Sequence, residues 1–519
     1  MRRREFLGTA AISLGGTLAA AALPSMKEPA AVGTFELDEL PLADLASGQK
    51  AGRYTAEGLT KSYLGRIAEI DSSGPGIHSV IETNPEALGI AAQLDRERAA
   101  GHVRGPLHGI PILIKDNIDT ADQMQTTAGS LALLGSKPAR DSAVAARLRA
   151  AGAVILGKTN LSEWANIRSS HATSGWSGRG GQTHNPYALD RNPCGSSSGS
   201  GAATSASLCA AAIGTETDGS IVCPSSSNGI VGLKPTVGLV SRAGIIPISH
   251  SQDTAGPMGR SVRDVAMLLG AISERAVDYT ESLDASGLKG ARLGVAHKFF
   301  GISDASDYVM QQALEALRGL GALLVDPADL PSQGKFDQSE ALVLSYELKA
   351  DMNAYLAQRP GAPANLAALI EFNEKNRPRE MPYFGQDLFI AAEQRGPLSS
   401  LEYQKALAND QNQSRAEGID LVMDQHHLDA LIAPTAGPAW LTDYATGDHD
   451  TGGSSTPAAV AGYPALTVPA GFVYGLPVGI TFFGRAWSEP TLLKLGYSFE
   501  QATRHRRQPR FLATMPGAQ

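Results

Sequence analysis

Cysteine is scarce in this sequence. Only Cys194, Cys209 and Cys223 occur among its 519 residues. A small secreted protein held together by disulfides has more cysteines, usually in even number. We therefore expect buried thiols. The alternative is one disulfide between Cys194 and Cys223, which flank the same Ser- and Gly-rich part of the chain.

Positive charge and long apolar runs are scarce as well. The formal net charge is −8 at pH 7, whereas nucleic-acid binding depends on basic surface that neutralises phosphates. Beyond residue 25, no apolar stretch approaches the length of a membrane-spanning helix. The 43% of apolar and 18% of charged residues are typical of a globular protein. We expect no nucleic-acid partner, no membrane span, and a monomer or simple homo-oligomer.

The N-terminal segment predicts export. Residues 2–7 read Arg-Arg-Arg-Glu-Phe-Leu, and an apolar run rich in Ala and Gly follows from residue 8 to residue 23. A charged head, an apolar middle and small residues at its end are typical of a secretory signal. The paired arginine followed by x-Phe-Leu resembles the twin-arginine signal, which directs export of folded proteins. We predict a signal peptide over 1–25, a linker over 26–36, and a periplasmic or secreted protein.

Helix and strand patterns alternate along the rest of the chain. A helical pattern covers 37–71, and an apolar run at 106–114 predicts a buried strand that ends at Lys115. A helix over 142–151 precedes a strand over 153–156, and a helix at 307–317 followed by a strand at 322–325 repeats this order. We predict an α/β fold, one large domain over 37–505 with a central mixed β-sheet covered by helices on both faces. Residues 506–519 are predicted to be a C-terminal tail.

Lys115 is the first candidate for chemistry. It stands alone as a cation at the end of the apolar segment Gly-Ile-Pro-Ile-Leu-Ile-Lys. Lysine rarely enters a core unless it is paired or functional. Desolvation there would lower its pKa and make the neutral amine available as a base. The alternative is a structural lysine whose ammonium reaches water.

The segment Asn-Pro-Cys-Gly-Ser-Ser-Ser-Gly-Ser-Gly-Ala-Ala at 192–203 is the second candidate. A flexible linker is disfavoured because an Ala-rich helix follows. A P-loop is excluded because the segment has no Gly-Lys-Ser/Thr ending. Residues 195–199 also match Gly-x-Ser-x-Gly, the nucleophile elbow of α/β-hydrolases. That alternative would make Ser197 the nucleophile and would require a histidine base.

The third candidate is Ile-Gly-Thr-Glu-Thr-Asp-Gly-Ser-Ile at 213–221. A Gly beside a Ser in a tight turn after an apolar run can direct several backbone N–H groups at one point, as an oxyanion hole requires. An ordinary Asp-Gly turn is the alternative.

Together these three segments closely resemble the amidase signature family. The family joins a lysine, a Gly-Ser-Ser-Gly loop and a Gly-Thr-Asp/Glu-x-x-Gly-Ser turn, with 24 residues between the two serines; here 220 − 196 = 24. The resemblance implies that Lys115 is the base, Ser196 the proton shuttle on a cis peptide bond, and Ser220 the nucleophile of an acyl-enzyme. Similar segments continue the match over about 37–505: residues 229–236, 238–242, 253–258, 433–435, 462–465 and 475–479.

The resemblance also assigns supporting roles. The backbone N–H groups of Thr217, Asp218 and Gly219, with that of Ser220, would form the oxyanion hole, and Ser197 would support Lys115. Most members have Gly at the position of Asp218 and Asp at that of Glu216. Asp218, with Cys194 and Ser198, resembles the bacterial peptide-amidase branch, which removes the C-terminal amide of peptides.

The chemistry implied needs no metal and no organic cofactor. The pair His426-His427 and the run 448–450 contain metal-ligating residue types, but we interpret both as solvated surface. The expected substrate is a peptide amide or a small-molecule amide. Hydrolysis would convert it to the acid and release ammonia or an amine. Alternatives are an amidase for small aryl or aliphatic amides, one subunit of an amidotransferase, and a non-enzymatic periplasmic solute-binding protein.

Overall fold

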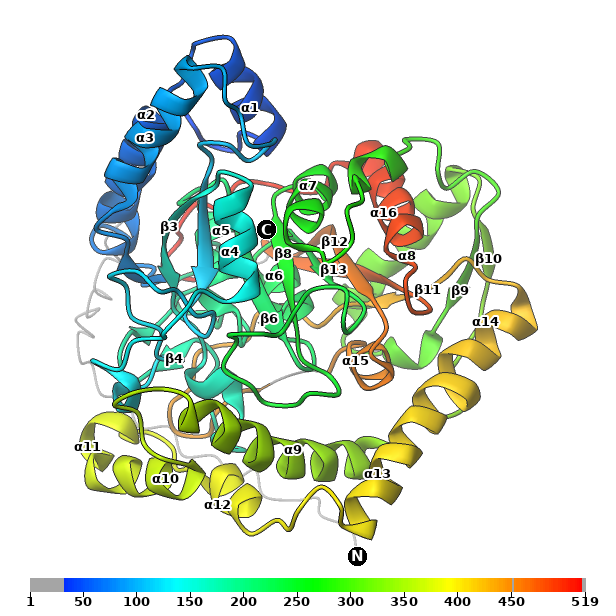
Figure 1. Cartoon of the computed structure of the whole chain (residues 1–519). Coiled ribbons are helices and arrows are strands. Elements are labelled where there is room, and N and C mark those ends of the chain that lie inside the picture. The colour runs from blue at the N-terminus through cyan, green and yellow to red at the C-terminus, as the bar shows by residue number, and fades with distance from the viewer. Residues whose placement is uncertain (1–31, 450–451, 516–519) are drawn as a thin grey trace, which may run out of the picture.

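The structure is a computed structural model that describes residues 32–449 and 452–515. The predicted signal peptide therefore lies outside the described residues. Within them, eleven strands form one sheet in the order β1-β3-β2-β6-β8-β7-β12-β13-β11-β9-β10 (Figure 1). The sheet is mixed, because β2 is parallel to β3 and β6, β9 is parallel to β10 and β11, and the other pairs are antiparallel.

The strands of this sheet are β1 (Val80–Thr83), β2 (Pro111–Lys115), β3 (Val154–Thr159), β6 (Ala211–Glu216), β7 (Val231–Lys234), β8 (Thr254–Gly259), β9 (Arg292–Val295), β10 (Leu323–Val325), β11 (Ala430–Pro434), β12 (Ala465–Val473) and β13 (Leu476–Phe483). A separate hairpin pairs β4 (Trp176–Ser177) with β5 (Gly181–Gln182).

The helices are α1 (Leu42–Lys50), α2 (Ala56–Arg66), α3 (Ala87–Ala99), α4 (Ala143–Ala150), α5 (Ser198–Ser205), α6 (Val222–Ser227), α7 (Val262–Ile272), α8 (Asp304–Gly319), α9 (Asp337–Ala357), α10 (Leu366–Lys375), α11 (Arg377–Glu380), α12 (Asp387–Glu393), α13 (Leu401–Gln411), α14 (Asp420–His426), α15 (Thr456–Ala461) and α16 (Glu489–Thr503).

Helices cover both faces of the sheet, as predicted. Successive side chains of a strand point to opposite faces, and β12 shows the consequence. Its Leu466 lies against Gly496 of α16, whereas its Thr467 lies on the other face with Ser226 of α6, around Gly479 of β13. Helix α16 and helix α6 therefore cover opposite faces. In Figure 1, α9 to α13 form a further layer below the sheet.

Local sequence explains several element boundaries. Helix α4 begins directly after Ser142, whose side chain accepts a hydrogen bond from the Ala145 amide at 3.1 Å, the usual role of a serine N-cap. The strand predicted before Lys115 is shorter than expected: it begins at Pro111 and not at residue 106. The helical pattern over 37–71 corresponds to α1, α2 and a π-helical segment, Ile67–Asp71.

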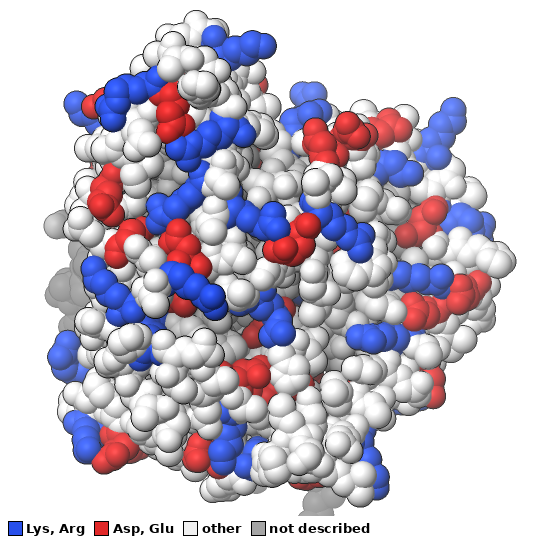
Figure 2. Space-filling view, viewed as in Figure 1, with Lys and Arg blue, Asp and Glu red and all other residues white. Residues whose placement is uncertain are grey.

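The surface carries charges of both signs. Figure 2 shows Lys and Arg side chains interspersed with Asp and Glu on the face viewed. None of the described helices combines the length and the apolar character that crossing a bilayer requires.

Candidate active site

The site lies at the carboxyl ends of two inner strands of the sheet. Strands β2 and β6 are parallel neighbours, with Ile114 opposite Ile213. Their carboxyl ends therefore lie side by side at the same end of the sheet, where ligands of α/β sheets commonly bind. Lys115 is the last residue of β2, and the turn 217–220 follows the last residue of β6. Two of the three sequence segments are thus adjacent because of strand order.

Lys115 lies inside the protein and not at its surface. Its side chain is fully buried, and its Nζ donates to Ser196 Oγ at 2.7 Å, to Ser197 Oγ at 3.1 Å and to Thr215 Oγ1 at 2.9 Å. Burial lowers the pKa of Lys115 to about 7, although the charges of Glu216 and Asp253 oppose this shift. The alternative of a lysine reaching water is wrong. A substantial neutral fraction near pH 7 makes Lys115 competent as a base.

The Ser-rich loop runs beside Lys115. The peptide bond between Gly195 and Ser196 is cis. Ser197 stands at the N-terminus of α5, fully buried, and its Oγ donates to the Thr215 carbonyl oxygen at 3.0 Å. A nucleophile elbow exposes its serine, so this placement favours the supporting role for Ser197. The Ser197 amide also donates to the Ser220 carbonyl oxygen at 3.1 Å, which joins the loop to the third segment.

Ser220 opens onto a pocket of about 340 Å³, which Asp218 and Gly219 also line. The turn that carries Ser220 is held from inside by the buried Glu216 carboxylate. Its two oxygens accept from the amides of Gly219 at 2.9 Å and Ile221 at 2.7 Å. The Gly219 amide is predicted to donate to the oxyanion. To do so, it would have to donate to Glu216 and to the oxyanion at the same time. That role stays a prediction, as it does for the amides of Thr217, Asp218 and Ser220.

Side chains on either side of the turn fix it further. Thr217 Oγ1 donates to Asp253 Oδ1 at 2.6 Å, and burial raises the pKa of the Asp253 carboxyl to about 6. Thr456 Oγ1 donates to Asp218 Oδ2 at 2.7 Å. The turn is therefore tied to the segment before β8 through Asp253 and to α15 through Thr456.

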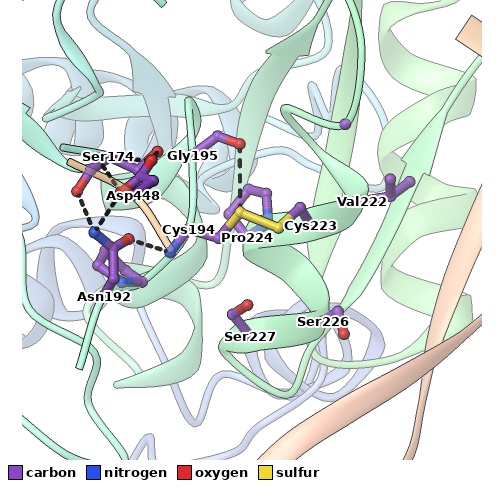
Figure 3. The surroundings of a disulfide bond; sticks show 12 residues. Ser174, Asn192, Cys194, Gly195, Val222, Cys223, Pro224, Ser226, Ser227 and Asp448 are labelled. Carbon is purple, nitrogen blue, oxygen red and sulfur yellow. Dashed lines mark hydrogen bonds between the residues drawn. A yellow bond between two sulfur atoms is a disulfide. The ribbon is translucent and has the colours of Figure 1, made fainter. Parts of the chain in front are cut away.

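A disulfide joins Cys194 to Cys223, with 6.0 Å between their Cα atoms (Figure 3). Cys194 precedes Ser196 by two residues, and Cys223 follows Ser220 by three. The expectation of free thiols is wrong for this pair and right for Cys209, which is free and buried. Sequence could name the pair only as an alternative, because its formation depends on the loop lying against α6.

Two features were missed or misread from the sequence. Asp448 is not solvated surface: it lines the pocket and accepts hydrogen bonds from the Ser174 amide at 2.9 Å and from Asn192 Nδ2 at 3.2 Å (Figure 3). His427 and His449 are exposed, as expected. The second feature is His250, which pairs with two carboxylates of α9. No local pattern marks Asp448 or this histidine, because their partners are remote in sequence.

Comparison with known proteins assigns the family. A family model described as Amidase matches residues 58–493. The chain belongs to the amidase family. A probable amidase of Arabidopsis thaliana is 40% identical over 504 residues, covering 92% of this chain and 93% of that protein. The peptide amidase of Stenotrophomonas maltophilia has 50% identity and a TM-score of 0.87, covering 92% of this chain and 100% of that chain. A glutamyl-tRNA(Gln) amidotransferase component of Chloroflexus aurantiacus is 34% identical, over 92% of this chain and 99% of that protein.

These findings confirm two predictions from the sequence. The amidase-signature resemblance is correct, and so is the α/β fold with a mixed central sheet. This amidase is accordingly a hydrolase that acts on amides. The alternative function of a solute-binding protein is excluded.

Proposed function

We propose that this amidase hydrolyses the C-terminal carboxamide of peptides through an acyl-enzyme on Ser220. The observation that carries the proposal is the position of Ser220. It faces a pocket large enough for part of a peptide. Its backbone carbonyl accepts from the amide of Ser197, the residue after Ser196, and the Ser196 side chain accepts from the buried Lys115. A hydroxyl is too weak an acid to ionise near pH 7, so Ser220 needs a proton acceptor close by.

In the proposed mechanism, neutral Lys115 accepts a proton from Ser196, and Ser196 accepts one from Ser220 as Ser220 attacks the carbonyl carbon. Backbone N–H groups of the turn 217–220 stabilise the oxyanion. The relay then returns the proton to the departing nitrogen, the C–N bond breaks, and an ester to Ser220 remains. Water hydrolyses this ester by the same relay, with no metal or organic cofactor in the scheme.

Peptide amides are the preferred substrate class for two reasons. First, Asp218 stands in the turn where most family members have Gly, which resembles the peptide-amidase branch. Second, the 50% identity to a peptide amidase is well above the 34% identity to the amidotransferase component. Small aryl or aliphatic amides are the second candidate, because the reacting groups would treat any unhindered carboxamide alike.

Mass spectrometry tests the substrate class. An amidated peptide should gain about one mass unit as its amide becomes an acid, with the chain otherwise intact. The Ser220→Ala variant is the matched control and should leave the peptide unchanged. Internal cleavage products would reject the proposal, and hydrolysis restricted to small amides would favour the second candidate.

We also propose that the enzyme is exported in folded form by a twin-arginine signal over residues 1–25. The proposal rests on the Arg3-Arg4-x-Phe-Leu sequence. Replacing both arginines by lysine should leave the precursor in the cytoplasm, as measured by cell fractionation. Unchanged export of that variant would reject the signal.

A further inference from the structure

A buried cluster of two carboxylates and one guanidinium flanks one wall of the catalytic pocket. Residues 165–167 line the pocket, Glu163 and Arg168 stand on either side of this segment, and both side chains are buried. Arg168 Nε lies 3.2 Å from Glu163 Oε1, and Arg168 Nη1 donates to the backbone carbonyl of Glu380 at 2.7 Å. Glu380 belongs to α11, so the cluster joins the wall to the layer formed by α9 to α13.

The wall has an unfavourable backbone conformation. Trp164, Ala165 and Asn166 have φ angles of 51°, 54° and 72°. Three successive left-handed residues, none of them glycine, are costly because each Cβ crowds its own backbone. Such a conformation persists only where the surrounding structure imposes it. The Trp164 ring packs on Phe389 of α12, with 5.8 Å between ring centroids, and the cluster holds both ends of the turn.

The cluster has more acidic groups than its one guanidinium can neutralise. If both carboxylates were ionised, Glu163, Glu380 and Arg168 would carry a net charge of −1, although all three side chains are buried. An uncompensated buried charge is strongly unfavourable, and a carboxyl group avoids it by taking up a proton. One proton shared by the two carboxyl groups makes the cluster neutral.

No second cation compensates the cluster from the described elements that surround it. Arg179, in the turn of the β4–β5 hairpin, pairs with Glu82 and Asp116. Arg379 of α11 is exposed. Asp387 of α12 is acidic and accepts hydrogen bonds from neighbouring serine hydroxyls. The balance of charge therefore depends on the two carboxyl groups and the one guanidinium.

The two carboxyl groups meet at Gly178. A Cβ atom at this position would lie 2.8 Å from Glu380 Oε2 and 2.9 Å from Glu163 Oε2. Glu163 Oε2 accepts from the Gly178 amide at 2.6 Å, whereas Glu380 Oε2 is buried and accepts no hydrogen bond from any described residue. A proton on Glu163 can be donated to this oxygen, and buried polar atoms are nearly always paired. Burial raises the pKa of Glu163 to about 8, with the charge of Glu380 and against that of Arg168.

We propose that Glu163, Arg168 and Glu380 are positioning residues that hold residues 164–167 in their substrate-binding conformation, with one proton shared between the two carboxyl groups. None of the three lines the pocket, so they act through the wall and not on the substrate. The inference rests on the proposed role of the pocket at Ser220, but not on a peptide substrate. Without the cluster, the left-handed turn should relax and the wall should move, which weakens substrate binding and leaves the proton relay in place.

Two substitutions of Glu163 test the positioning role. Glu163→Gln is the conservative variant, because its amide can donate to Glu380 Oε2 and accept from Gly178, whereas Glu163→Ala loses both contacts. If the wall is competent in only about a tenth of the Glu163→Ala molecules, KM for an accepted amide at pH 7 should rise about tenfold. Its kcat should change little, because the wall takes no part in the chemical step, and Glu163→Gln should restore the wild-type KM.

Glu374→Ala is the matched control, because it removes an exposed carboxylate of α10 from the same layer. Its KM should equal that of the wild type. A rise in KM in Glu163→Gln as large as in Glu163→Ala would overturn the positioning role. So would a fall in kcat of Glu163→Ala that matches the rise in KM.

Ala165→Gly tests the strain in the wall. Glycine adopts a left-handed φ without steric cost, so this substitution should make the wall less dependent on the cluster. Added to Glu163→Ala, it should lower KM by about threefold, the usual effect of relieving one such residue. The single variant Ala165→Gly corrects for the lost methyl group. A double variant that binds no better than Glu163→Ala would contradict the strained wall.

Thermal unfolding tests the shared proton and needs no substrate. A carboxyl group with a raised folded-state pKa gives stability that is present at low pH and lost as pH rises through that pKa. The wild-type Tm should therefore fall relative to that of Glu163→Gln between about pH 5 and about pH 8, and the difference should then stay constant. Glu380→Gln leaves one carboxylate for one guanidinium and should behave like Glu163→Gln. Glu374→Gln should follow the wild type, and parallel curves for all four proteins would overturn the shared proton.

Failure of this inference is distinguishable from failure of the proposed function. If Ser220 were not the nucleophile, Ser220→Ala would stay active, whereas the unfolding curves of the Gln variants would be unaffected. If the cluster did not hold the wall, Glu163→Ala would keep the wild-type KM, whereas Ser220→Ala would still be inactive.

Discussion

Lys115 Nζ and Ser196 Oγ are 2.7 Å apart, and both side chains are fully buried. At this distance a proton can pass directly between them, without an intervening water. Lys115 is held at the same time by Ser197 and Thr215, so its amine is fixed in position. The proposed mechanism uses Lys115 and Ser196 together, as one proton relay, and this distance is compatible with that role.

The relay predicts how substitutions combine. Ser220→Ala should abolish acylation, because the attacking oxygen is lost. Ser196→Ala and Lys115→Ala should each lower kcat by at least about a thousandfold, and the double variant should be little worse than either, because they act together. Ser197→Ala should be milder, since Ser197 only orients Lys115. Steady-state kinetics of the variants check this order.

Covalent labelling identifies the nucleophile independently. A serine-directed fluorophosphonate should modify Ser220, as shown by peptide mapping. Label on Ser197, together with activity in Ser220→Ala, would restore the elbow alternative.

The pH dependence of kcat/KM should report Lys115. Burial lowers its pKa to about 7, and the neutral amine is the active form. Activity should therefore rise as pH increases through about 7 and level off above it. The Asp253 charge raises the Lys115 pKa, so Asp253→Asn should move the inflection to lower pH. An inflection near the pKa of a free lysine would contradict the assignment.

The Cys194–Cys223 disulfide should stabilise both the fold and the catalytic geometry. It closes a loop over a sequence separation of 29, for which chain entropy predicts about 3–4 kcal/mol of stabilisation. The double variant Cys194→Ala/Cys223→Ala should lose that much free energy of unfolding, and also activity, because both serines lie beside the bond. Denaturant unfolding and kinetics measure the two effects.

Cys209→Ala is the control for the disulfide, because it removes the free thiol and leaves the bond intact. Reductant should lower its activity as much as it lowers that of the wild type. A double variant as active as the wild type would refute the geometric role of the disulfide.

His250 should make stability depend on pH. Its Nδ1 lies 3.0 Å from Asp351 and its Nε2 3.2 Å from Glu347, both on α9. The hydrogen bond with Asp351 raises the pKa of His250 most, against burial and the charge of Arg242. The raised pKa means that the stabilisation is complete at low pH and is lost as pH rises through the folded-state pKa.

The matched variant His250→Gln isolates this effect. Wild type should exceed it in free energy of unfolding by up to about 1 kcal/mol below about pH 6, since the pairs are partly exposed, and the difference should shrink at higher pH. A difference that grows with pH would have the wrong sign. It would exclude a stabilising role for the protonated His250 side chain.

By itself the sequence determined the family and the fold class, and it named the candidate reacting groups. Lys115, Ser196 and Ser220 stand in segments whose local composition and spacing are specific, and helix–strand alternation follows from periodicity within each element. Both kinds of signal are local, so neither needs tertiary contacts to be recognised.

Only the tertiary structure decided which distant groups meet. The Cys194–Cys223 bond, the contact of His250 with α9 and the place of Asp448 in the pocket all join residues from separate segments. Such contacts follow from strand order and helix packing, which bring together residues that no local pattern relates.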